Sequence, residues 1–278
     1  MRFTKMQGCG NDYIYVNCFE ESVSSPHELA RSVSDRHFGI GSDGLVLICP
    51  SNIADCRMRM FNSDGSESEM CGNAIRCVAK YVYDRDIIHK RELSVETLAG
   101  IKYITINADE NDIARTMTVD MGAPITEASQ IPVKAENSPV TDLRLTAFGR
   151  EFTFTCVSMG NPHAVTFIDE EIGSFETERF GRIFEVDEHF PHRSNIEFAE
   201  VVSPTHLKMR VWERGAGETL ACGTGTCATF AAACLNGICP RGPVTVDLLG
   251  GKLTIEWNAN DGHIYMTGPA EFVFDGEI

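Results

Sequence analysis

The sequence predicts an α+β protein with two pseudo-symmetric, strand-rich domains, each built around a central helix. The first reason is an internal repeat, because residues 58–77 align with residues 209–227 and place Cys71 and Cys222 in equivalent positions, 151 residues apart. The second is a series of short runs in which polar and apolar residues alternate, a pattern typical of half-buried strands. The length of 278 residues accommodates two domains without requiring them, so the repeat decides the domain count.

Other matches keep the same register to within one residue. They pair Gly10-Asn11 with Gly160-Asn161, and 100–102 with 251–253. Together with Met58 and Met209, and Cys71 and Cys222, these make four matches in one register, which indicate a duplicated fold.

The duplication sets the expected domain bounds. One domain should span 1–118 and the other 119–278, and the last strand, within 264–278, is a candidate to return to the first domain. Two copies of one fold would face each other across an active-site cleft that receives equivalent residues from both sides.

The expected elements follow from local patterns. Strands are predicted over 1–17, 45–49, 57–61, 93–97 and 103–108. Helices are predicted over 27–36, after Ser25 as cap and Pro26 in the first turn, over 74–84, and over 225–235, which ends at Asn236-Gly237. Residues 131–139 should form a connecting loop near the domain junction.

Charge and composition exclude several classes of function. The formal net charge of −16 argues against a nucleic-acid partner, since that binding depends on clustered Lys and Arg, and against anionic membranes. No segment reaches the roughly 18 apolar residues of a membrane-spanning helix, and the first residues lack the apolar stretch of a signal peptide. We expect a cytoplasmic protein in which the eleven cysteines are free thiols.

Cys71 and Cys222 each lie between a polar loop and a predicted helix, with Gly next in the chain. A cysteine at a helix N-terminus should have a pKa below the ordinary value of about 8.5, because the helix dipole favours the thiolate. One residue could then be a thiolate base while the other remains a thiol acid. Two thiols on opposite faces of a carbon suit stereoinversion, and this chemistry requires no cofactor and no metal.

The same helix N-termini offer backbone N–H groups to a bound carboxylate. Such groups would also stabilise the negative charge that grows on deprotonation. The groups concerned belong to Gly72, Asn73, Gly223 and Thr224.

Less specific interpretations remain open for these motifs. A metal or redox site would need CxxC or suitably spaced His, which are not present, and a cysteine can simply cap a helix while its sulfur packs inside. The repetition in register favours the chemical role. Cys77 and Cys227 are expected to pack in the core, and Asp12, Asp43 and Asp64 to shape turns.

Four long motifs resemble the diaminopimelate epimerase family over nearly the whole chain. They are GCGNDY at 8–13, NSDGSESEMCGNAIRC at 62–77, MGNPHAV at 159–165 and ERGAGETLACGTGTCA at 213–228. The resemblance implies interconversion of LL- and meso-diaminopimelate, in lysine and peptidoglycan precursor synthesis, by two thiols and without pyridoxal phosphate. It also implies a diamino diacid as small-molecule partner and a homodimer.

The resemblance assigns roles to the residues that match these motifs. Cys71 and Cys222 would be the acid and base, and Asn11 and Glu213 would hold the substrate near its reacting centre. The distal amino and carboxylate groups would be read by Asn62, Asn161, Asn195 and Arg214, whose donors and acceptors suit them. His163 would support the site, or be an oriented structural histidine.

The chain departs from the family pattern at Gly44, where some members carry a substrate-contacting Gln; the repeat aligns Gly44 with Asn195. A proline or hydroxyproline racemase is the nearest alternative, but those enzymes generally have Cys-Gly-His where this chain has Cys71-Gly72-Asn73. A second alternative is a non-enzymatic redox-switch protein in which Cys71 and Cys222 form a reversible disulfide.

Overall fold

The computed structural model describes all 278 residues, which fall into two compact units. Unit 1 comprises Met1–Asp120 and Thr267–Ile278, and unit 2 comprises Met121–Met266. The sequence-based bounds left open whether the last strand, within 264–278, returns to the first domain. Residues 267–278 belong to unit 1, in which β18 (Glu271–Glu277) pairs antiparallel with β1 (Arg2–Gly8). No helix has both the length and the apolar character needed to cross a membrane.

The strands of unit 1 follow the order β18-β1-β2-β3-β4-β6-β7-β8. Two pairs, β2 with β3 and β4 with β6, are parallel, and the others are antiparallel. The bounds are β2 Asn11–Asn17, β3 Gly44–Cys49, β4 Cys56–Asn62, β5 Glu67–Ser68, β6 Glu92–Thr97, β7 Gly100–Ala108 and β8 Ala114–Asp120. The predicted strands at 45–49, 57–61, 93–97 and 103–108 lie within β3, β4, β6 and β7, whereas the run 1–17 is divided into β1 and β2 by a turn at Cys9-Gly10.

Unit 2 repeats this arrangement in the order β9-β10-β11-β12-β13-β15-β16, and its third and fifth pairs, β11 with β12 and β13 with β15, are parallel as they are in unit 1. The bounds are β9 Leu143–Ala147, β10 Arg150–Ser158, β11 Pro162–Ile168, β12 Asn195–Ser203, β13 His206–Glu213, β14 Gly217–Thr219, β15 Val244–Leu248 and β16 Gly251–Trp257. Strand β17 (Ile264–Gly268) begins in unit 2 and ends in unit 1, since the division falls after Met266. The register repeats too, since Val46 lies opposite Met60 in unit 1 and Glu197 opposite Val211 in unit 2.

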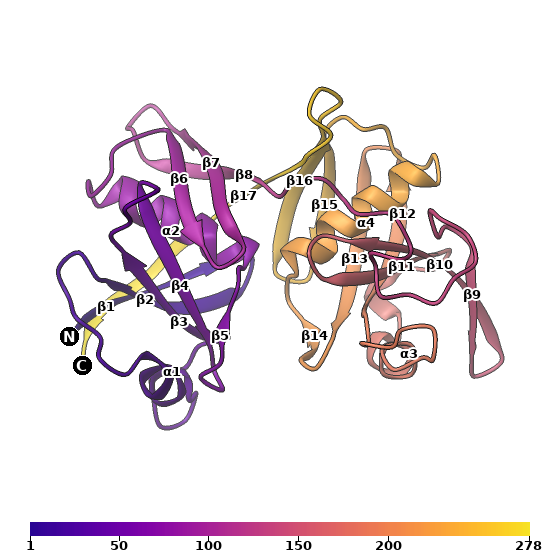
Figure 1. Ribbon diagram of the computed structural model, residues 1–278, viewed down its shortest axis with the longest axis horizontal. Coiled ribbons are helices and arrows are strands. Elements are labelled where there is room, and N and C mark those ends of the chain that lie inside the picture. Colours follow the sequence, from indigo (N-terminus) through magenta and orange to yellow (C-terminus); the bar gives the residue numbers. More distant parts are fainter. The chain divides into compact units, whose positions relative to one another are not determined.

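A buried helix of 13 residues lies against the strands of each unit, α2 (Gly72–Asp84) in unit 1 and α4 (Gly223–Leu235) in unit 2 (Figure 1). Helix α2 contacts β1, β2, β7 and β8, and α4 contacts β10 to β13, β15 and β16. Both helices begin two residues earlier than predicted, immediately after Cys71 and Cys222. Each cysteine is therefore fixed to a helix that the core surrounds.

The remaining helices are shorter. Helix α1 (Pro26–Ser34) begins with Pro as predicted, although the Ser25 side chain forms no capping hydrogen bond. Helix α3 (Thr177–Phe184) and the 3-10 turn η1 (Ile172–Ser174) were not predicted. The loop at 131–139 lies inside unit 2 rather than at the junction, and Ile131 is part of a core cluster.

Candidate active site

Cys71 occupies the N-cap of α2, as predicted. Its carbonyl accepts from the Ile75 N–H at 3.0 Å, and its Sγ lies 3.5 Å from Oδ1 of Asn11. The side chain is half-buried and forms no capping bond. Gly72 and Asn73 supply the first two N–H groups of the helix, which have no acceptor within a regular α-helix. A thiol and two backbone N–H groups at the positive end of the helix dipole thus share one helix terminus.

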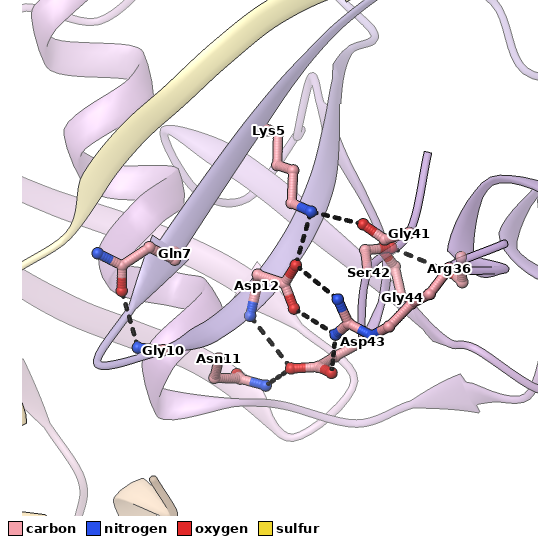
Figure 2. A network of polar contacts seen from close by, with 11 residues as sticks. Lys5, Gln7, Gly10, Asn11, Asp12, Arg36, Gly41, Ser42, Asp43 and Gly44 are labelled. Carbon is pink, nitrogen blue, oxygen red and sulfur yellow. Dashed lines mark hydrogen bonds and ion pairs between the residues drawn. The ribbon is translucent and has the colours of Figure 1, made fainter. Parts of the chain in front are cut away.

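The orientation of Asn11 is set by a polar network at the start of β2 (Figure 2). Its Nδ2 donates to Oδ2 of Asp43 at 2.7 Å, which directs its Oδ1 to Cys71. Arg36 contacts both Asp12, at 2.7 Å, and Asp43, at 2.9 Å, and Lys5 contacts Asp12 at 2.8 Å. Partial burial raises the pKa of Asp12, but hydrogen bonds from Arg36 and Lys5 outweigh it and leave the pKa below its ordinary value.

Arg76, which the sequence analysis did not single out, is fully buried beneath the first turn of α2. Its guanidinium donates to the Gly72 carbonyl at 3.0 Å, to Oδ1 of Asn73 at 3.0 Å and to the carbonyl of Pro269 at 3.1 Å. The side chain of Asn73 therefore holds the start of the helix. In the sequence, the only indication of this role was an arginine within the helix predicted over 74–84.

Asn62 ends β4 opposite Gly44, and its Nδ2 donates to Oγ of Ser66 at 3.0 Å. A Cβ at Gly44 would lie 2.1 Å from the Phe61 carbonyl oxygen and 2.8 Å from the Tyr13 ring. The β3–β4 pair therefore has no room for a side chain at position 44, which is a physical reason for Gly where some family members carry Gln.

Cys222 occupies the N-cap of α4 and is only 6% exposed. Its Sγ accepts from the Gly225 N–H at 3.4 Å and lies 3.5 Å from Oγ1 of Thr224. The predicted lowering of its pKa is wrong. Burial, and then the negative charges of Glu213 and Glu197, raise the pKa of Cys222 well above its ordinary value, and the bonds at the helix terminus offset only part of this.

Glu213 and Arg214 follow each other at the end of β13. Glu213 accepts from Oγ1 of Thr219 at 2.5 Å. The Arg214 side chain is exposed and donates to the His192 carbonyl at 3.1 Å, while its backbone N–H donates to Oδ1 of Asn195 at 2.8 Å. The guanidinium of Arg214 thus retains N–H donors that can bind a carboxylate.

Asn195 is 4% exposed, and both ends of its amide bond to the backbone: Oδ1 to Arg214 and Nδ2 to the carbonyl of Pro162 at 3.0 Å. It ties the start of β11 to the residue that follows β13. Its first role in the structure is to position these neighbours.

His163 is fully buried and bonded at both ring nitrogens. Nδ1 lies 2.6 Å from Oε1 of Glu197, and Nε2 lies 3.0 Å from Oδ1 of Asn161. Glu197 was missed, although a glutamate inside the apolar strand SNIEF was a visible signal. The predicted site residues divide between the units, with Asn11, Asn62, Cys71, Gly72 and Asn73 in unit 1, and Asn161, His163, Asn195, Glu213, Arg214, Cys222, Gly223 and Thr224 in unit 2.

Sequence comparison identifies relatives along the whole chain. A family model described as "Diaminopimelate epimerase" matches residues 3–127 and 155–273. A protein of that name from Methanococcus maripaludis (strain C6) is 58% identical over 278 residues, covering 100% of this chain and 99% of its own length. Another, from Acetivibrio thermocellus, is 59% identical and covers 100% of this chain and 98% of its own.

Solved structures share the fold at low sequence identity. A Bacillus anthracis phenazine biosynthesis protein of the PhzF family has a TM-score of 0.72 at 17% identity, covering 100% of this chain and 98% of its own. A hydroxyproline epimerase from Agrobacterium vitis has a TM-score of 0.68 at 13% identity, covering 99% and 91%. These structures support the two-domain α+β fold alone. The extent of the family match and the identity to its curated relatives show that the chain belongs to the diaminopimelate epimerase family.

Proposed function

We propose that this protein interconverts LL- and meso-2,6-diaminopimelate by proton transfer at one Cα, with Cys71 and Cys222 as the two acid–base groups. The observation that carries the proposal is the repeated setting of the thiols. Each unit places one cysteine at the N-cap of its buried 13-residue helix. Membership of the diaminopimelate epimerase family makes the protein an isomerase and supports this substrate.

In this mechanism one cysteine, as thiolate, removes the Cα proton, and the C–H electron pair moves toward the α-carboxylate. The other cysteine, as thiol, delivers a proton to the opposite face of the same carbon. The first thiol has then gained the proton that the second has lost, so the reaction can run in reverse. Backbone N–H groups of Gly72, Asn73, Gly223 and Thr224 would stabilise the charge that develops on the carboxylate.

The environment of Cys222 supports an acid role in the first turnover. Burial and the neighbouring carboxylates hold the pKa of its thiol above the ordinary range, so it remains protonated at neutral pH. Cys71 would then be the first base, beside the Oδ1 of Asn11.

The remaining residues would distinguish the two ends of the substrate. Asn11 and Glu213 would contact the groups on the reacting carbon, and the exposed fork of Arg214 would bind the distal carboxylate. Asn62, Asn161 and Asn195 would complete the distal contacts. We further propose a homodimer, and a cytoplasmic location that would keep the eleven free cysteines reduced.

The test is to incubate reduced protein with LL-diaminopimelate in deuterium oxide, following Cα deuterium by mass spectrometry and isomers by chiral chromatography. We expect meso product with deuterium at the inverted centre, and loss of both signals in Cys71→Ala and Cys222→Ala. Cys234→Ala, at a half-exposed thiol near the end of α4, should keep full activity. Turnover of proline or hydroxyproline instead would transfer the assignment to that class.

A further inference from the structure

Unit 2 contains a buried carboxylate–imidazole pair that the two-thiol mechanism does not use. Glu197 and His163 are both fully buried, with Oε1 and Nδ1 2.6 Å apart. The second oxygen of Glu197, Oε2, is buried without a hydrogen-bond partner. On its other side His163 reaches Oδ1 of Asn161, at 3.0 Å from Nε2.

Unit 1 has no counterpart of this pair. The equivalent strand register places Val46 where unit 2 has Glu197, and Tyr13 where it has His163. Burying a carboxylate costs several kcal/mol unless it is paired and hydrogen-bonded. The pair in unit 2 therefore carries a cost that the equivalent place in unit 1 does not.

The surroundings of the pair disfavour a net negative charge. Glu197 faces Glu213 from β13, Cys222 from the start of α4 and Cys156 from β10, all of which are neutral or acidic. Burial raises the pKa of Glu197, although His163 lowers it in part. Because the groups that face this buried pair supply no positive charge, the pair is most stable when it is neutral, which requires that it retain one proton.

Only some positions for this proton fit the contacts. In one arrangement Glu197 is a carboxylate and His163 an imidazolium; in the other the carboxyl group donates from Oε1 to Nδ1. A proton on Oε2 would leave a buried hydroxyl without an acceptor, which is costly. In both remaining arrangements Nε2 of His163 carries a hydrogen.

This proton determines the direction of the Asn161 amide. Because Nε2–H donates to Oδ1 of Asn161, the NH2 group of that amide is turned away as a donor. The repeat partner of Asn161 is oriented in the opposite sense, since Asn11 gives its NH2 group to Asp43 and directs its oxygen to Cys71. An asparagine present in both units is thus a donor in one and an acceptor in the other.

We propose that Glu197 is a positioning residue that keeps a proton on Nε2 of His163 and thereby fixes Asn161 as a hydrogen-bond donor to a carboxylate oxygen of the substrate. The proton placement is a property of the protein alone. The substrate contact rests on the proposed function.

The first experiment detects the proton on Nε2 of His163 directly. Protein labelled with 15N-histidine, with His163 assigned through His163→Gln, is titrated without substrate from about pH 6 to about pH 9, where an ordinary histidine loses its charge. We expect Nε2 of His163 to stay protonated throughout. A ring that titrates normally, or an Nε2 without hydrogen, would overturn the proposal whether or not the enzyme is active on diaminopimelate.

The second experiment tests whether Glu197 acts through Asn161. A neutral amide at position 197 can accept from Nδ1–H, which frees Nε2 to act as an acceptor and lets Asn161 turn over. Glu197→Gln should therefore raise KM for LL-diaminopimelate about tenfold, the size of one hydrogen bond, with a smaller change in kcat. In an Asn161→Ala background the same substitution should have almost no further effect.

The matched control is Glu200→Gln, on the same strand but bonded to Ile172 and Lys208, which should leave KM unchanged. Equal effects of Glu197→Gln with and without Asn161 would show a merely structural role and refute the proposal. If Glu197→Gln does not fold, the spectra of the unaltered protein decide the question. An unaltered protein inactive on diaminopimelate would count against the proposed function and leave the spectra as the test of proton placement.

Discussion

Asn11 and Asp43 are joined by a hydrogen bond of 2.7 Å from Nδ2 to Oδ2. Because Asp43 occupies the donor end of the amide, the oxygen of Asn11 faces the Cys71 thiol at 3.5 Å. An aspartate that local sequence assigns to a turn thus directs the group beside a proposed catalytic thiol. Arg36 and Lys5 hold the same network together.

Removing this carboxylate should impair catalysis more than stability. Asp43→Ala frees the Asn11 amide to rotate, and we expect kcat/KM for LL-diaminopimelate to fall about tenfold to a hundredfold, as for a hydrogen bond to a charged group. Steady-state kinetics measure this. Asp109→Ala removes another loop aspartate of unit 1, bonded to Arg115, and should leave kcat/KM unchanged; equal losses in both variants would refute the role of Asp43.

The pKa of Cys222 should respond to its acidic neighbours. The thiolate forms only as pH rises through a raised pKa, so at neutral pH iodoacetamide should modify Cys222 slowly. Glu213→Gln removes a negative charge that disfavours the thiolate, so the pKa should fall and modification at fixed pH should accelerate about tenfold. Timed labelling with peptide mass spectrometry gives the rate. Glu218→Gln, whose carboxylate pairs with Arg210, is the control; an unchanged rate in Glu213→Gln would contradict the assigned cause.

A diacid substrate should depend on the exposed guanidinium of Arg214. Arg214→Ala should raise KM about a hundredfold with a smaller change in kcat, because the lost contact lies away from the reacting carbon. Arg214→Lys should recover only part of the affinity, since an ammonium cannot bind a carboxylate through a fork. The control is Arg193→Ala, which removes a cation paired with Glu185 at 3.4 Å. Full activity of Arg214→Ala would exclude this anchor.

A glutamine side chain at position 44 should destabilise the protein. Gly44→Gln would force a Cβ to within 2.1 Å of the Phe61 carbonyl oxygen, so we expect the free energy of unfolding to fall by at least about 1–3 kcal/mol. Urea denaturation measures the change. Gly242→Gln, where an added Cβ meets nothing within 4 Å, should have little effect. Equal stability of the two variants would show that the β3–β4 pair opens to accept a side chain.

Much of the fold could be predicted because its signals are local. Alternating residues identified β1 to β4, β6 and β7 of unit 1, and Pro26 and Asn236-Gly237 marked helix ends that the structure confirms. Helix α3 was missed because it is short and is held by tertiary contacts: Phe180 and Phe184 pack against Phe152. The C-terminal strand was left open because its pairing with β1 joins residues more than 260 positions apart, as Arg2 with Glu277.

The sequence by itself determined the duplication, the α+β class and the placement of Cys71 and Cys222 at equivalent helix N-termini, because a repeated motif and a helix start are both written in neighbouring residues. Only the tertiary structure decided what surrounds each thiol. It brought Asp43 to Asn11 and Glu197 to His163, residues 32 and 34 positions apart, and it buried Cys222 beside two carboxylates, which reversed the expected direction of its pKa. Burial and charge act through space, so they depend on distances that a linear pattern does not contain.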